Sequence, residues 1–152
     1  MTGMSGTGKS SALAELSRLG FVVVDTDSKV WSKWVGDEWL WREDRMAELL
    51  AADRERPLFV SGCMSNQGKF YDRFDAVVLL SAPAEVILDR IERRTTNDYG
   101  KTAAERAFVL DHLASVEPQL RATCTHELDA SRPLGEVVDG LVAIAGSSPL
   151  PR

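Results

Sequence analysis

The chain has 152 residues, of which 44% are hydrophobic and 27% charged, and a net charge of −5. These values predict one globular domain with a single core. An acidic chain is not expected to coat a nucleic acid polymer, although a small nucleotide needs only a local cationic pocket. No apolar run reaches transmembrane length, and Cys63 and Cys124 lack metal-ligand spacing. We expect a cytoplasmic monomer with free thiols and no membrane partner.

The most specific motif lies at the start of the chain, where residues 3–10 read GMSGTGKS, a complete G-x-x-x-x-G-K-[ST] phosphate loop. Its glycines let backbone N–H groups point at a triphosphate, Lys9 reaches the β- and γ-phosphates, and Ser10 ligates Mg²⁺. A helix expected over 10–19 directs its N-terminus at the same phosphates. The alternative is a flexible Gly/Ser-rich terminus. The motif predicts a site for ATP and Mg²⁺, since no N-K-x-D guanine motif follows.

Only Met1 and Thr2 precede this loop, although a buried strand of four to six apolar residues normally leads into it. Either the true start lies upstream, or the central strand is missing. A missing central strand leaves unpaired strand edges inside the core. We therefore favour an upstream start.

Strand and helix patterns alternate along the rest of the chain. Apolar runs predict buried strands at 21–24, 58–60, 76–80 and 125–128. Apolar periodicity and capping residues predict helices at 40–52 and 84–94, a long helix from Thr102 kinked near Pro118, and a last helix from Pro133. This alternation predicts a three-layer α/β/α sandwich with a mostly parallel sheet over residues 1–146, followed by a disordered tail at 147–152.

Four features together resemble the P-loop small-molecule and nucleoside-monophosphate kinases. They are the phosphate loop, Asp-Thr-Asp at 25–27, a glycine-containing strand end at 61–63, and the basic segment 89–94. The run FVVVDTD at 21–27 is similar to the shikimate kinase strand that ends in D-x-D. The run DRIERR at 89–94 is similar to the entry to the adenylate kinase lid. The resemblance implies a P-loop NTPase fold with a short lid at about 95–102, and ATP-dependent phosphoryl transfer to a small-molecule acceptor.

The same resemblance implies roles for two arginines. Arg90 lies near the adenine or the phosphates and Arg94 on the phosphates, and their spacing of four places both on one helix face. A lid that carries arginines excludes water and neutralises the transferring group. The alternative is a solvated basic helix end. The expected nucleotide-binding residues are those of the loop and two arginines: Gly3, Ser5, Gly6, Thr7, Gly8, Lys9, Ser10, Ser11, Arg90 and Arg132.

Asp25 and Asp27 follow a predicted parallel strand, at the edge where open α/β sheets bind ligands. The resemblance implies that Asp25 lies nearer the metal, which it holds together with Ser10, and that Asp27 lies nearer the acceptor. Asp27 is suited to accept a proton from an acceptor hydroxyl. The alternative is a pair of turn and cap carboxylates. The expected catalytic residues are therefore Lys9, Asp25, Asp27, Arg90 and Arg94.

The segment 61–67 (SGCMSNQ) is expected to face the acceptor, with its polar side chains as hydrogen-bonding partners. Ser61-Gly62-Cys63 stands where motor ATPases carry an aspartate, which favours a kinase. Trp31 and Trp34 are expected on one helix face, either in the core or stacked on a ring, and His112 is expected at the surface. The sequence predicts an ATP-dependent small-molecule kinase with an unidentified acceptor. The alternatives are a non-catalytic ATP-binding regulatory module and a simple NTPase.

Overall fold

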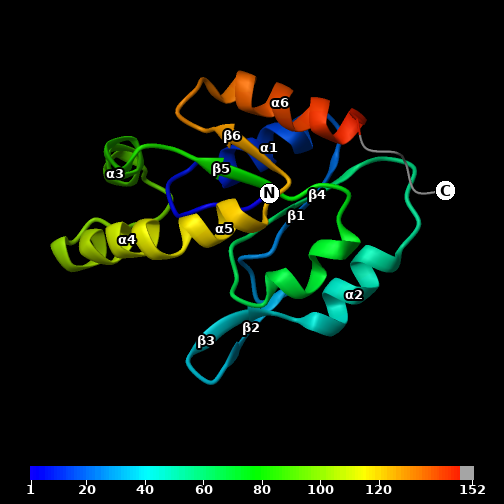
Figure 1. Ribbon diagram of the computed structural model, residues 1–152, viewed down its shortest axis with the longest axis horizontal. Helices are drawn as coiled ribbons and strands as arrows, with labels where there is room; N and C mark the ends of the chain where they lie inside the picture. Colours follow the sequence, from blue (N-terminus) through cyan, green and yellow to red (C-terminus); the bar gives the residue numbers. More distant parts are fainter. Residues whose placement is uncertain (148–152) are drawn as a thin grey trace.

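A computed structural model describes residues 1–147 of the chain (Figure 1). The predicted tail thus falls outside the described residues except for Ser147, which belongs to the last helix. In chain order the elements are α1 (Lys9–Arg18), β1 (Val22–Asp25), β2 (Ser32–Val35), β3 (Glu38–Trp41), α2 (Glu43–Ala51), β4 (Leu58–Ser61), the 3₁₀ helix η1 (Gln67–Arg73), β5 (Val78–Ser81), α3 (Ala84–Arg93), α4 (Ala103–Ser115), α5 (Glu117–Thr123), β6 (His126–Asp129) and α6 (Leu134–Ser147). No helix within residues 1–147 is long and apolar enough to cross a membrane.

The first two residues occupy the centre of the sheet. β1 pairs in parallel with β4, and β5 pairs in parallel with β6. Thr2 forms a parallel bridge with Leu79 of β5, and the Met1 amino group donates to the Val60 carbonyl of β4 at 2.7 Å. Residues 1–2 therefore connect the two strand pairs in the order β1, β4, residues 1–2, β5, β6. Residues 1–2 thus occupy the central strand position next to the loop. The upstream start of the chain remains a prediction.

Helices cover both faces of this sheet, as the alternation of side chains along β5 shows. Val78 and Leu80 pack in a buried cluster with residues of α1, α3 and α6. Leu79, between them, packs on the opposite face against Leu120 of α5. Successive side chains of a strand point to opposite faces, so the run 78–80 needs apolar neighbours on both sides. The predicted α/β fold with three layers and parallel pairing is confirmed.

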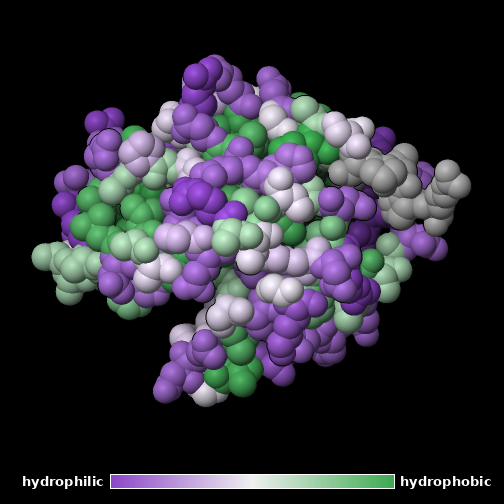
Figure 2. Space-filling view, in the orientation of Figure 1, coloured by the Kyte–Doolittle hydropathy of each residue, from purple (hydrophilic) through white to green (hydrophobic). Residues whose placement is uncertain are grey.

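The tryptophan-rich segment differs from the expectation. β2 and β3 form an antiparallel hairpin with Trp34 opposite Trp39, and the helix that follows begins only at Glu43. The expectation that Trp31 and Trp34 share a helix face was wrong. The reason is local, because Gly36 adopts a φ of 61° in a two-residue turn with Asp37, which is typical of tight hairpins. The hairpin projects from the body of the molecule, and a hollow separates it from the lobe of α3 and α4 (Figure 2).

The predicted long helix is two helices. The capping box at its start is present, with Thr102 accepting from the Glu105 N–H and the Glu105 carboxylate accepting from the Thr102 N–H. The chain breaks after Ser115, and Pro118 lies in the first turn of α5, where its missing N–H leaves no partner unsatisfied.

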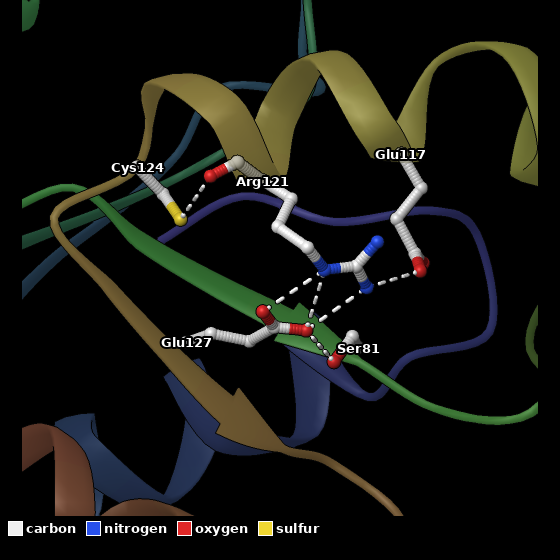
Figure 3. Close-up of polar contacts among 5 residues, drawn as sticks. All are labelled: Ser81, Glu117, Arg121, Cys124 and Glu127. Atoms are coloured by element: carbon white, nitrogen blue, oxygen red, sulfur yellow. Dashed lines mark hydrogen bonds and ion pairs between the residues drawn. The ribbon is translucent and has the colours of Figure 1, made fainter.

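An ionic cluster attaches α5 to the sheet (Figure 3). Arg121 of α5 donates to Glu117 at 2.8 Å and to Glu127 of β6 at 2.9 Å. Glu127 also accepts from the Ser81 hydroxyl of β5 at 2.6 Å. The Glu117 side chain is only 11% exposed, so Arg121 neutralises a largely buried carboxylate. The cluster fixes the position of α5 beside the carboxyl ends of β5 and β6.

Replacing Arg121 by methionine is expected to destabilise the protein by about 1–3 kcal/mol at neutral pH, because it leaves Glu117 buried without its cation. The hydrogen bonds from Arg121 lower the pKa of Glu127. A carboxyl group whose pKa is lowered on folding stabilises the folded state at pH values above its unfolded pKa. The part of the stability loss that comes from Glu127 therefore shrinks as the pH falls through the pKa of the folded state. Urea denaturation at several pH values measures the effect. Arg18→Met, which removes an exposed pair with Glu15, is the control and is expected to leave the stability nearly unchanged. Equal losses in the two variants contradict the prediction.

Candidate active site

The phosphate loop runs from the sheet centre to the first turn of α1. Gly6 and Gly8 have φ values of 83° and 91°, and Gly8 caps α1. Residues that carry a Cβ rarely adopt this left-handed backbone conformation. The Lys9 ammonium donates to the Gly3 carbonyl at 2.6 Å and to the Met4 carbonyl at 3.0 Å, so the lysine lies along the loop. A Cβ built on Gly8 meets no atom closer than 3.9 Å, which leaves an open cradle in front of the helix N-terminus.

The Lys9 ammonium is desolvated within the loop, which is unfavourable for a positive charge that no anion neutralises. Burial lowers the pKa of its ammonium, and Arg94 lowers it further, whereas Cys63, Asp25 and Asp27 act in the opposite direction. An anion placed against the ammonium would offset the cost of burial. The loop therefore fits a phosphate group both by its shape and by its electrostatics.

Arg90 of α3 and Arg94, the residue directly after this helix, both reach the loop. Arg90 donates to the Ala130 carbonyl at 2.6 Å and to the Thr7 carbonyl at 3.4 Å. Arg94 donates to the Ser5 hydroxyl at 3.4 Å. Arg94 also donates to the carbonyls of Asn97 at 3.0 Å and Tyr99 at 2.6 Å, and so holds the segment after α3.

Arg132 lies differently from these two. It follows β6 and forms an ion pair with Glu136 at 2.7 Å, with its side chain 62% exposed. It lines the same cavity as the loop, and its guanidinium donates to Glu136 rather than to the loop.

The two aspartates lie at the carboxyl end of β1, beside the end of β4. Between them, Thr26 is fully buried and donates its hydroxyl to the Ser61 carbonyl at 2.7 Å. This bond holds the turn, and both aspartates remain exposed. Asp25 accepts a hydrogen bond from the Asp27 N–H at 3.0 Å, and this is the turn contact that the alternative interpretation expected. Asp27 in turn accepts a hydrogen bond from the Trp39 indole at 3.2 Å. Trp39 thus attaches the hairpin to the strand end.

One cavity of about 1380 Å³ collects all these groups. Every residue expected to bind the nucleotide or the metal or to act in catalysis lines it: Gly3, Ser5, Gly6, Thr7, Gly8, Lys9, Ser10, Ser11, Asp25, Asp27, Arg90, Arg94 and Arg132. The volume exceeds the roughly 300–1,000 Å³ of a site for one small ligand. The cavity therefore has room for a nucleotide and a second small molecule.

Several lining residues were not expected from the sequence. Phe108 and His112 of α4 line the cavity with their ring centroids 4.0 Å apart. Their i,i+4 spacing is the signal that they share a helix face. Trp39 also lines the cavity, and so does Trp34, for which stacking on a ring was one of the two expectations. Tyr99 joins them from the segment after α3.

Part of the expected acceptor segment has another use. The Asn66 side chain accepts a hydrogen bond from the Trp41 backbone N–H and donates one to the Trp41 carbonyl, each at 3.1 Å. Gln67 donates to Thr2 at 3.1 Å and to Tyr71 at 2.7 Å. Both side chains are buried, so their expected role as ligand contacts was wrong. From the same segment Ser61, Gly62, Cys63 and Met64 line the cavity.

Gly62 allows β1 and β4 to approach each other at the cavity floor. A Cβ on Gly62 would lie 2.0 Å from the Thr26 hydroxyl and 3.3 Å from the Trp41 indole nitrogen. Gly62→Ala is therefore expected to destabilise the protein by about 1–3 kcal/mol, since both neighbours are buried. Thermal denaturation measures the loss against Gly68→Ala, where the added methyl meets nothing within 4 Å. Equal stability of the two variants would show that the close approach places no constraint on Gly62.

A phosphate loop at the carboxyl edge of a parallel sheet, followed directly by a helix, defines a P-loop nucleotide-binding protein. Residues 1–111 match the family model described as AAA domain, and the chain belongs to this family. No curated protein matches the chain.

Solved structures share the fold over almost the whole chain. The shikimate kinase from Acinetobacter baumannii in complex with shikimate is 16% identical with a TM-score of 0.68, and the match covers 96% of this chain and 90% of that one. The shikimate kinase from Bacteroides thetaiotaomicron is 16% identical with a TM-score of 0.64 and 94% of each chain covered. A gluconokinase from Sinorhizobium meliloti 1021 is 20% identical with a TM-score of 0.60, covering 95% of this chain and 89% of that one. The resemblance to P-loop kinases is confirmed for the fold.

Proposed function

We propose that the protein is an ATP-dependent phosphotransferase that acts on a small molecule. The observation that carries this proposal is the single cavity, in which a phosphate loop, two arginines and two strand-end carboxylates face a volume of about 1380 Å³. A nucleotide site alone needs neither the second carboxylate, Asp27, nor the extra volume. The kinase-like neighbours support the proposal through their shared fold.

In this proposal the loop and α1 hold the triphosphate, with Lys9 against the β- and γ-phosphates. Ser10 is exposed at the start of α1, and its hydroxyl together with the Asp25 carboxylate would hold Mg²⁺. When bound, Mg²⁺ neutralises phosphate charge. Arg90 and Arg94, which contact the loop already, spread further positive charge over the phosphates.

The transfer step requires that the acceptor hydroxyl lose its proton before or during the reaction. The acceptor oxygen forms a bond to the γ-phosphorus while the bond from this phosphorus to the β–γ bridging oxygen breaks, which yields ADP. The hydroxyl proton passes to the carboxylate of Asp27, which is exposed to the cavity. Asp27 is held in place through its hydrogen bond with Trp39.

Arg94→Gln is expected to lower kcat about 10²–10³-fold, because a cation aimed at the transferring phosphate acts mainly in the transition state. The matched control is Arg106→Gln, whose arginine pairs with Glu92 at 3.4 Å and does not line the cavity. Steady-state ADP release measures both variants. A loss that is equal in both, or absent from Arg94→Gln, argues against contact with the phosphates.

Acceptor dependence separates the kinase from its alternatives. ADP release from Mg-ATP is measured with and without the low-molecular-weight fraction of a cell extract, filtered to remove proteins. A kinase releases ADP much faster with the fraction. A simple NTPase gives the same rate in both, and a regulatory module binds ATP without releasing ADP in either.

A further inference from the structure

The charges that line the cavity are segregated. The lining cations come from α1, α3 and the segment after β6: Lys9, Arg90, Arg93, Arg94 and Arg132. Of the lining carboxylates, Asp89 of α3 is paired with Arg93 at 2.9 Å, whereas Asp25 and Asp27 lie at the end of β1. The arginines of α3 and of the segment after β6 follow strands β5 and β6, so they stand over the half of the sheet opposite to β1, whereas Lys9 follows residues 1–2 at the sheet centre. We name the part of the cavity lined by Asp25, Asp27, Trp34, Trp39 and residues 61–64 the acidic end.

The basic residues near the acidic end are directed elsewhere. Lys69 pairs with Glu43 at 2.7 Å, and Arg42 donates to the Lys29 carbonyl at 3.1 Å. Lys33 precedes Trp34 on β2 and so points to the other face of the hairpin. Among residues 1–147, no lysine or arginine of the hairpin, α2 or η1 lines the cavity. A carboxylate or phosphate bound at this end would be repelled by two aspartates, and Lys9, the lining cation on which these aspartates act, is directed to the phosphate loop through its bonds to the Gly3 and Met4 carbonyls.

Aromatic surface completes the acidic end. Trp34 and Trp39 are cross-strand partners on one face of the hairpin, with ring centroids 5.4 Å apart. The same face carries Trp41, which is buried in the core and fixes the base of the hairpin. Trp34, in contrast, is 67% exposed although it lines the cavity. An exposed indole beside carboxylates offers an apolar surface for the flat face of a ring and acceptors for its hydroxyl groups.

From this arrangement we infer that the phosphoryl acceptor is a hydroxylated ring without negative charge, neutral or cationic, that stacks on the Trp34–Trp39 pair while Asp25 and Asp27 accept hydrogen bonds from its hydroxyl or amino groups. The inference rests on the proposed kinase function and specifies its substrate class. It distinguishes this site from one built for a carboxylate or a nucleoside monophosphate, because such an acceptor needs cations where this chain places aspartates.

Charge fractionation of possible acceptors tests the inference and does not require the compound to be identified. The low-molecular-weight fraction of a cell extract is passed over an anion exchanger, and Mg-ATP turnover by the full chain is measured with the unbound and the bound pools. We expect the unbound pool, which holds neutral and cationic compounds, to stimulate ADP release at least tenfold more than the bound pool. Stimulation by the bound pool alone overturns the inference and leaves the kinase function standing. Stimulation by neither pool overturns both.

A variant pair tests the aromatic surface. Trp34→Ala is expected to raise the KM for the active pool about tenfold and to leave the KM for ATP within twofold, since Trp34 lies away from the phosphate loop. Val35→Ala is the matched control, because Val35 is its neighbour on the hairpin, half exposed, and outside the cavity lining. Circular dichroism checks that both variants fold. An unchanged acceptor KM in folded Trp34→Ala contradicts stacking.

Discussion

Replacing Lys9 by methionine is expected to abolish the stabilisation of the protein by Mg-ATP. A ligand at a hundredfold excess over its Kd stabilises the folded state by about 2.7 kcal/mol, which for a domain of this size raises the Tm by roughly 5–10 °C. Methionine keeps most of the apolar stem of the lysine but removes the ammonium that lies along the loop and donates to two of its carbonyls. The triphosphate then loses its charged partner in a partly buried site.

The unliganded variant supplies a second readout. Burial lowers the pKa of Lys9, so the charged lysine costs folding free energy when no anion is present. The Tm of ligand-free Lys9→Met is therefore expected to equal or exceed that of the wild type. Lys69→Met is the control, because it removes a surface lysine distant from the loop and should keep the full ATP shift. An ATP shift in Lys9→Met as large as in the wild type would falsify the assignment of the loop.

Asp27→Asn is expected to lower kcat about 10²–10⁴-fold, the contribution typical of a general base. Asparagine retains the size of the side chain and an oxygen that can accept from the Trp39 indole, so the hairpin stays attached. What it loses is the ability to take the acceptor proton. The Tm shift with Mg-ATP should persist, because Asp27 lies at the end of β1 and outside the phosphate loop.

The control for this substitution is Asp37→Asn, at the exposed turn of the hairpin. Initial rates with the small-molecule fraction and thermal melts with Mg-ATP are measured for both variants. A kcat of Asp27→Asn within twofold of the wild type would mean that Asp27 serves only as the turn and hairpin contact that the structure also gives it.

The sequence predicted best where a residue's role follows from its neighbours in the chain. The phosphate loop spans eight residues, and its left-handed glycines and lysine occur where the motif requires them. The buried parallel strands around it follow from apolar runs that must be covered on both faces. Arg90 and Arg94 reach the loop because a spacing of four puts them on one helix face, which the sequence also reveals.

The sequence predicted least where a role depends on contacts between distant segments. Trp31 and Trp34 were expected on one helix face, and the two-residue turn at Gly36 forms a hairpin instead. Asn66 and Gln67 look like polar ligand contacts, yet they satisfy the backbone of Trp41 and the side chain of Thr2. No local pattern encodes these partners, which lie 25 and 65 residues away. The acidic end arises in the same way, from a hairpin folded against the end of β1.

The fate of the γ-phosphate tests the proposed phosphoryl transfer most directly. The full chain is incubated with Mg-ATP labelled at the γ-phosphate and the small-molecule fraction, and the label is then divided between inorganic phosphate and organic phosphate. We expect label to accumulate in an organic phosphate with the wild type and Lys69→Met, and not with Lys9→Met or Asp27→Asn. Label found only in inorganic phosphate, at equal rates with and without the fraction, would contradict phosphoryl transfer and identify a hydrolase.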